Sequence, residues 1–150
     1  MFEFLFGGKK DLEHNAKKVK KWQNEHKALA TLAVRTVEYY EKGDLKKSKK
    51  ELGKLQSVAL NHLMDEDVTF FELFKKADNN TTDQHIVNAI KEFRSSFIDT
   101  KKVLIHFFIH YTDPNVALDD IFIEKLKGII EALVARIEFE ETNLYVLINK

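Results

Sequence analysis

The chain has 150 residues, of which 44% are hydrophobic, and its 24 Lys and Arg side chains balance its 24 Asp and Glu side chains. This length and composition predict one globular domain over residues 1–150, and the zero net charge argues against a dedicated nucleic-acid binder. The chain contains no cysteine, which excludes disulfides and cysteine-based metal sites. Any metal must therefore be bound by histidine and carboxylate side chains, and we expect a cytoplasmic protein.

The first eight residues predict a short apolar cap on the domain. Met1–Phe6 is apolar but too short for the hydrophobic region of a signal peptide, and it lacks a basic leader. Weak anchoring to a membrane or a partner is the alternative for this segment. No apolar stretch approaches the roughly 18 residues that a membrane span needs, so we expect no membrane-spanning segment.

Helix-breaking residues divide the rest of the chain into four segments of about 30 residues, each roughly 45 Å long if helical. Gly43-Asp44 ends the first segment, residues 78–82 end the second, and residues 112–115 end the third. Polar side chains near these breaks can accept hydrogen bonds from the free amides of the next helix. The expected N-caps are Thr82, and Asp113 or Asn115.

Each segment repeats its apolar residues at steps of three and four, which is the spacing of a helix that packs into a bundle. The predicted buried seams of the first three are Leu12, Ala16, Val19, Gln23, His26, Ala30, Ala33, Val37, Tyr40; Leu52, Leu55, Ala59, His62, Glu66, Phe70, Leu73; and Ile86, Ile90, Phe93, Phe97, Thr100, Leu104, Phe107, Tyr111. The fourth offers two neighbouring seams, namely Phe122, Leu126, Ile129, Leu133, Arg136, Glu140, and Ile130, Val134, Ile137, Glu141, Leu144, Ile148. Four similar helices with short connections predict an all-α, antiparallel up-down-up-down four-helix bundle.

Polar residues interrupt these seams at one level of the predicted bundle. They are His26, His62, Glu66, Arg136, and one of Glu140 or Glu141. Counting at ~1.5 Å per residue from Gly43 places the two histidines within about 3 Å in height, with Glu66 one turn further. Arg136 and the candidates Glu140 and Glu141 fall within a turn of the same layer. Because an unpaired buried polar group costs several kcal/mol, these side chains must satisfy one another, bind water or bind a metal.

Two imidazoles and two carboxylates on facing helices suit iron, manganese or zinc, whereas calcium and magnesium prefer oxygen ligands alone. The alternative is a metal-free buried network. In that network Glu66 pairs with Arg136, and each histidine donates to a carboxylate or a carbonyl. The residues leave both interpretations open.

The motifs Glu25-His26-Lys27 and His62-Leu63-Met64-Asp65-Glu66-Asp67, followed by Phe70-Phe71, resemble the hemerythrin family and its HHE cation-binding relatives. Members of that family are four-helix bundles with a non-haem di-iron centre that bind dioxygen, sense oxygen or redox state, or handle iron. The resemblance extends over residues 20–76. It implies a hemerythrin-like bundle, iron as the metal and dioxygen as a ligand.

The second half departs from the hemerythrin pattern. Ala89 and Phe93 stand where the family has two histidines, and Arg136 stands where the fourth helix has a histidine before its acidic ligand. The resemblance therefore implies one metal, with His26, His62, Glu66 and Glu141 as its ligands. An empty site in which the Arg136 guanidinium replaces the missing cation is the other outcome.

A second resemblance comes from Glu131-Ala132-Leu133-Val134-Ala135-Arg136-Ile137-Glu138-Phe139-Glu140-Glu141, with Trp22 in the first segment and Phe70-Phe71-Glu72 in the second. These residues resemble the regulator-of-sigma-D family, helical proteins that bind the primary sigma factor of bacterial RNA polymerase. This resemblance implies a metal-free interaction module with a protein partner. It explains Arg136 as the buried partner of Glu140 but does not explain the two histidines.

Few other features indicate chemistry. His106 and His110 have the spacing of metal ligands on a helix, but no nearby carboxylate completes a set, so we interpret them as residues at the core boundary. Phosphate-binding loops, Ser-His-Asp arrangements and glycine-rich nucleotide turns are absent from the sequence. Nothing beyond a possible redox metal therefore indicates an enzyme.

Overall fold

The computed structural model describes the backbone of residues 9–80 and 84–144, and the side chains of residues 17–69, 71–72, 88, 91–95 and 97–142. These residues form four α-helices and a π-helical turn, and the described ranges contain no strand. The elements are α2 (Lys9–Glu41), α3 (Leu45–Asn80), α4 (Gln84–Thr112), α5 (Asp120–Phe139) and η1 (Glu140–Leu144). The cap expected at residues 1–8 and the N-cap expected at Thr82 lie outside the described residues.

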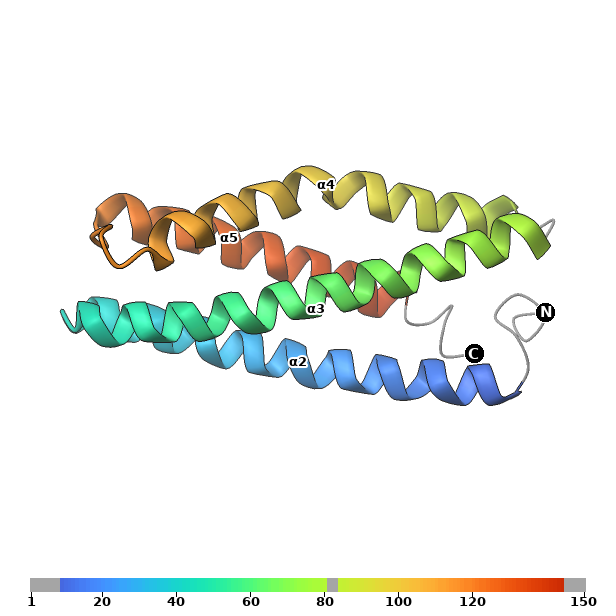
Figure 1. Ribbon diagram of the computed structural model, residues 1–150, viewed down its shortest axis with the longest axis horizontal. Helices are drawn as coiled ribbons and strands as arrows, with labels where there is room; N and C mark the ends of the chain where they lie inside the picture. The colour runs from blue at the N-terminus through green and yellow to red at the C-terminus, as the bar shows by residue number, and fades with distance from the viewer. Residues whose placement is uncertain (1–8, 81–83, 145–150) are drawn as a thin grey trace.

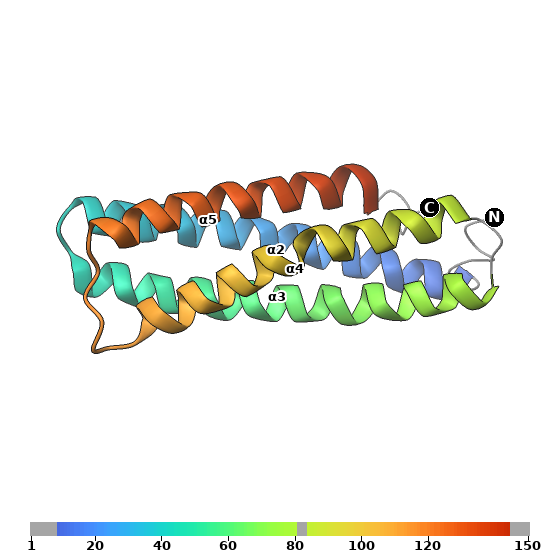
Figure 2. The same cartoon turned by 90° about the horizontal axis from the view of Figure 1, so that it is seen from above.

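The four helices run lengthwise beside one another (Figures 1 and 2). Helix α2 packs against α3 and α5, and α4 packs against α3 and α5, so the contacts form a closed ring around one core. Consecutive helices are antiparallel, which confirms the predicted all-α bundle. The helical seams therefore meet along a common axis, and residues at matching heights on different helices can touch.

Gly43 makes the turn between α2 and α3 possible. Its φ of +80° lies in the left-handed region, where a side chain would be strained. The Asp44 amide then donates to the Tyr39 carbonyl at 2.9 Å, and the Asp44 side chain accepts from the Lys47 amide at 3.1 Å. The predicted break is thus the C-terminal end of one helix and the N-cap of the next.

The N-cap of the fourth helix lies further along the chain than predicted. Asp119 caps α5, accepting from the Phe122 amide at 2.8 Å. Asp113 instead accepts from the Asn115 amide at 2.9 Å, which closes a local turn beside the proline. The prediction of Asp113 or Asn115 as the cap was therefore wrong, because an Asx turn uses the same side-chain oxygen and leaves residues 113–119 as a loop.

Most residues of the predicted seams are buried, but two positions in α2 differ from the prediction. In α2, Trp22 and Leu29 are buried while Gln23 and Ala30 are exposed, so the apolar neighbour replaces the predicted residue at each of these two steps. In α5 the seam from Phe122 to Glu140 is buried, and the alternative seam is partly or fully exposed where it is described. No helix in the described part of the chain is both long enough and apolar enough to span a membrane.

Candidate metal centre

Four potential metal ligands converge in the core. His26 comes from α2, His62 and Glu66 come from α3, and Glu140 stands where α5 passes into η1. All four side chains are buried, and one ligand atom from each lies within 4.8 Å of the others. The matched height predicted for the two histidines is therefore confirmed, with Glu66 one turn beyond His62 as expected.

The separations within this cluster match those between ligands of one metal ion. The two Nε2 atoms of His26 and His62 are 3.1 Å apart. His26 Nε2 is 3.3 Å from Glu140 Oε1, and His62 Nε2 is 3.1 Å from Glu66 Oε1. Because Zn–N and Zn–O bonds are about 2.0–2.2 Å long, neighbouring ligands of a tetrahedral or octahedral ion lie roughly 3.0–3.5 Å apart. These three separations are those of neighbouring ligands, and the four residues together could hold a metal ion.

A carboxylate lies beside the outer nitrogen of each histidine. His26 Nδ1 is 3.1 Å from Glu141 Oε1, and His62 Nδ1 is 2.8 Å from Glu25 Oε1. In the tautomer these contacts favour, Nδ1–H donates to the carboxylate and the Nε2 lone pair points into the cluster. Metal-binding histidines commonly have this arrangement, because the outer hydrogen bond fixes the ring and makes the inner nitrogen more basic.

Glu140 and Glu141 therefore occupy different positions around one imidazole. Glu140 is fully buried beside Nε2 of His26, whereas Glu141 is 43% exposed beside Nδ1. The structure brings Glu140, and not Glu141, together with the other three potential ligands. The α-helix changes to a π-helical turn at these residues, and such irregular turns are frequent at functional sites.

The Arg136 guanidinium closes the cluster on the side of α4. Its Nε donates to Glu140 Oε2 at 3.1 Å and its Nη2 donates to Glu66 Oε1 at 3.4 Å, and the side chain is only 5% exposed. The guanidinium carbon lies 5.0 Å from the ring centre of Phe93 and 5.4 Å from that of Phe97. Arginine stacks well on aromatic faces and pairs with carboxylates, so both sides of this cation are satisfied.

The pKa values of the two buried carboxyl groups, Glu66 and Glu140, shift in opposite directions. Burial raises the pKa of Glu66, but hydrogen bonds from His62 and Glu140 and the charges of His62 and Arg136 lower that pKa to about 2. Burial and the neighbouring Glu66 carboxylate raise the pKa of Glu140 to about 9, against the opposing effect of Arg136. The pair therefore holds one proton at neutral pH, and Glu140 donates it to Glu66.

The pKa of His62 is also shifted, above its ordinary value. Burial lowers the pKa of this imidazole, but the hydrogen bond and charge of Glu66 and the hydrogen bond of Glu25 outweigh burial and raise it. A proton on His62 Nε2 can be shared with Glu66 and His26, both 3.1 Å away. Protons and Arg136 thus supply the positive charge that the buried carboxylate requires in the metal-free protein.

The same network is complete without a metal. Among the side chains described, the only buried polar atom that lacks a hydrogen-bond partner is Glu51 Oε2, which is outside the cluster. Metal binding would therefore displace protons from an already satisfied site rather than fill an unsatisfied one. The geometry accommodates both interpretations that the sequence left open.

Two further charged residues near Arg136 were not predicted. Arg136 Nη2 is 3.8 Å from Asp67 Oδ1, and Lys101 of α4 forms an ion pair with the same carboxylate. No sequence pattern indicated this pairing, because the partners are far apart in the chain and only helix packing brings them together. His106 and His110 are exposed on α4 and join no group of three potential ligands among the described residues.

Comparisons with known proteins give no assignment. No protein-family model matches the sequence. Neither the curated proteins nor the solved structures give a match. The structure therefore defines the class only as a four-helix protein with a buried His/His/Glu/Glu cluster that can bind a metal.

Proposed function

We propose that the protein binds a single transition-metal ion in the buried cluster, as a hemerythrin-like bundle with a reduced site. The observation that carries this proposal is the convergence of four ligand atoms within 4.8 Å in the core. His26, His62, Glu66 and Glu140 would be the ligands. Glu25 and Glu141 would orient the two imidazoles through their outer nitrogens.

Iron is the first choice of metal, with manganese and zinc as the alternatives. A set of two imidazoles and two carboxylates suits all three ions, and the resemblance to hemerythrins favours iron. A bound iron ion would supply redox chemistry or dioxygen binding. The role we propose for such a site is the sensing or handling of metal or oxygen.

Arg136 explains why one metal ion is proposed rather than two. Its guanidinium binds Glu140 Oε2 and also contacts Glu66 Oε1, so both buried carboxylates already have a permanent cation beside them. Phe93 packs against this cation instead of offering an imidazole. A fixed positive charge beside the cluster also opposes the entry of a second divalent ion.

Elemental analysis of the protein purified without an affinity tag tests the proposal. We expect up to one equivalent of iron, manganese or zinc per chain. His62→Ala and Glu66→Ala should each abolish metal retention, because the remaining protein ligands of this buried site cannot complete the coordination shell. His106→Ala is the matched control, since it removes an exposed histidine outside the cluster and should retain the metal.

Two results of the elemental analysis would contradict the proposal. Two tightly bound ions per chain would contradict the reduced site. No metal after reconstitution with each of the three ions would contradict metal binding altogether. A second measurement guards against misfolded variants: at 100-fold excess over the dissociation constant the ion should stabilise the native protein by about 2.7 kcal/mol, and circular dichroism shows whether each variant is folded.

The second candidate function is a metal-free interaction module that resembles an anti-sigma regulator. The observation that favours it is the pairing of Arg136 with Glu140 and Glu66, which contributes to satisfying the cluster without a metal. A basic sigma-type partner would meet the acidic second half of the chain, where Asp120, Glu124 and Glu138 are exposed. Reversing two of these charges should slow association and flatten its salt dependence. Recovery of no polymerase component from a bacterial lysate, or of equal amounts with both proteins, would exclude this function.

A further inference from the structure

A cavity of about 550 Å³ lies between α3 and α4, beside the buried cluster but outside it. Its walls are largely apolar. Phe93 and Phe97 line its inner side, and Val68, Phe71 and Ile98 line its outer part. The last three are 58%, 46% and 53% exposed. Exposed apolar side chains grouped beside a cavity can mark a binding site, and this volume lies in the range of small-molecule sites.

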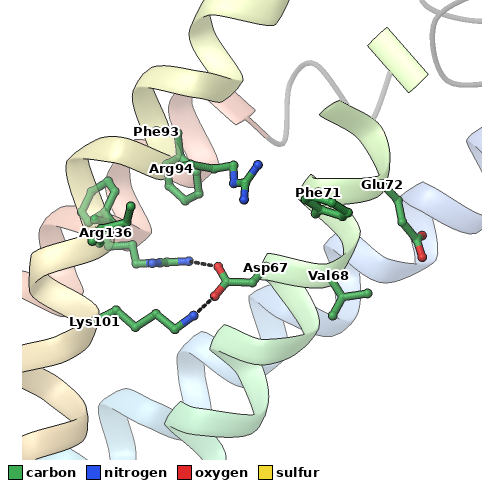
Figure 3. A pocket seen from close by; sticks show the side chains of 10 residues that line it. Asp67, Val68, Phe71, Glu72, Phe93, Arg94, Lys101 and Arg136 are labelled. Carbon is green, nitrogen blue, oxygen red and sulfur yellow. Dashed lines mark hydrogen bonds and ion pairs between the residues drawn. The ribbon is translucent and has the colours of Figure 1, made fainter. Parts of the chain in front are cut away.

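Three cations and two carboxylates line this cavity. Arg94, Lys101 and Arg136 line it together with two carboxylates, Asp67 and Glu72. Figure 3 shows Arg94 of α4 facing Phe71 of α3, and the Arg94 guanidinium carbon lies 5.3 Å from the centre of that ring. One end of the cavity is therefore an aromatic surface beside a cation, which suits a flat ring.

The other end already binds a carboxylate. Asp67 reaches between Lys101 and Arg136, and its two oxygens face the two cations (Figure 3). The pair of cations is thus spaced to bind a carboxylate. A ligand with a carboxylate could share these cations with Asp67 or take its place, whereas a cationic ligand would meet an Asp67 carboxylate that already has two cations beside it.

We propose that the cavity between α3 and α4 binds a small organic anion with a flat aromatic body. The ring would lie against Phe71 and Phe97, and the carboxylate would bind Lys101 and Arg136. The inner wall is closed by Arg136 and the Phe93 ring, so the ligand is of small-molecule size rather than a partner helix. Arg136 is shared with the buried cluster, whereas Lys101 and the aromatic walls lie outside it.

Three probes with one ring and different charges test the proposal: indole-3-acetate, tryptophol and tryptamine. They are titrated into the whole protein with EDTA present, so that metal binding has no influence, and binding is measured by calorimetry and by backbone NMR shifts. We expect indole-3-acetate to bind at least about tenfold more tightly than tryptamine, with tryptophol between them. The largest shifts should fall on residues of α3 and α4 around the cavity.

Two variants and a matched control test where the carboxylate of the ligand binds. Lys101→Met should weaken the binding of indole-3-acetate about tenfold, because a charge-assisted hydrogen bond is lost. Asp67→Asn should strengthen the binding of indole-3-acetate several-fold, because the Asp67 carboxylate no longer competes with the ligand for the two cations. Lys102→Met alters the next residue, which is exposed and does not line the cavity, and should change nothing.

Other results would overturn the proposal. They are the absence of binding at millimolar indole-3-acetate, tighter binding of tryptamine, weaker binding in Asp67→Asn, or equal losses in Lys101→Met and Lys102→Met. All three substituted side chains are partly or fully exposed, so the variants are expected to fold. An unchanged circular dichroism spectrum verifies this for each one.

Discussion

Replacing Arg136 with methionine removes the buried cation of the cluster while keeping an apolar side chain of similar length. In the metal-free protein this change strands the ionised carboxylate of Glu66, which lies 3.4 Å from the guanidinium. Glu140 is affected less, because the pKa of about 9 keeps it protonated at neutral pH. The result is a buried carboxylate that keeps its contacts with His62 and Glu140 but loses its permanent cation, which is among the more destabilising changes in a protein core.

The magnitude follows from the contacts that are lost. A hydrogen bond to a charged group contributes about 1.5–3 kcal/mol, and a desolvated cation over an aromatic ring contributes about 0.5–2 kcal/mol. Together with the stranded charge, we expect Arg136→Met to lower the free energy of unfolding by about 3–5 kcal/mol. With a urea m-value of about 2 kcal/mol/M, the midpoint should fall by roughly 1.5–2.5 M.

The assay is urea unfolding at pH 7 with EDTA, followed by circular dichroism. Arg35→Met is the control, because it makes the same change at an exposed position of α2. The double variant with Glu66→Gln should recover part of the loss, since no charge is then left unpaired. If Arg136→Met shifts the midpoint no more than Arg35→Met does, the pairings of this guanidinium contribute no net stability and the reasoning fails.

Two predictions concern pH. Burial raises the pKa of Asp65, but hydrogen bonds from Trp22, Lys18 and Lys21 lower it to about 2; its stabilisation is therefore present above about pH 4 and is lost as the pH falls towards 2. Asp65→Asn should cost about 1–2 kcal/mol at pH 7 in urea unfolding and should flatten this acid dependence, and a variant that keeps the full dependence would contradict this assignment. The pKa of Glu140 is raised from 4.5 to about 9, so the metal-free protein should lose stability as the pH rises between these values. Glu140→Gln should remove that loss in unfolding series from pH 5 to pH 9, and an unchanged slope would show that another group titrates there.

The sequence predicted the fold because bundle packing depends on a repeat that local residues already display. Steps of three and four between apolar residues define one face of each helix, and Gly43 marks a turn that needs a left-handed residue. The matched height of His26 and His62 followed from counting residues on both sides of that turn. This succeeded because the rise of an α-helix is constant and the connection is short.

Where either of two adjacent residues could face the core, the sequence did not predict which one is buried. Trp22 and Gln23 lie about 100° apart on the helix, and only the packing of α2 against its neighbours shows that Trp22 enters the core and donates to Asp65 at 2.8 Å. The same difficulty separates Glu140 from Glu141. Glu140 continues the first of the two seams predicted for the fourth helix and Glu141 belongs to the second, and only the packing of α5 shows that the first seam is the buried one.

The sequence by itself determined which helices form, their antiparallel order and the level at which polar residues interrupt the core. These properties depend on local periodicity and on chain length. Only the tertiary structure decided which carboxylate joins the two histidines, how Arg136 is paired, and that a cavity opens beside Lys101. Those properties depend on the rotation of each helix about its axis and on distances between side chains from different helices, and a rotation of a few tens of degrees changes them without altering the sequence pattern.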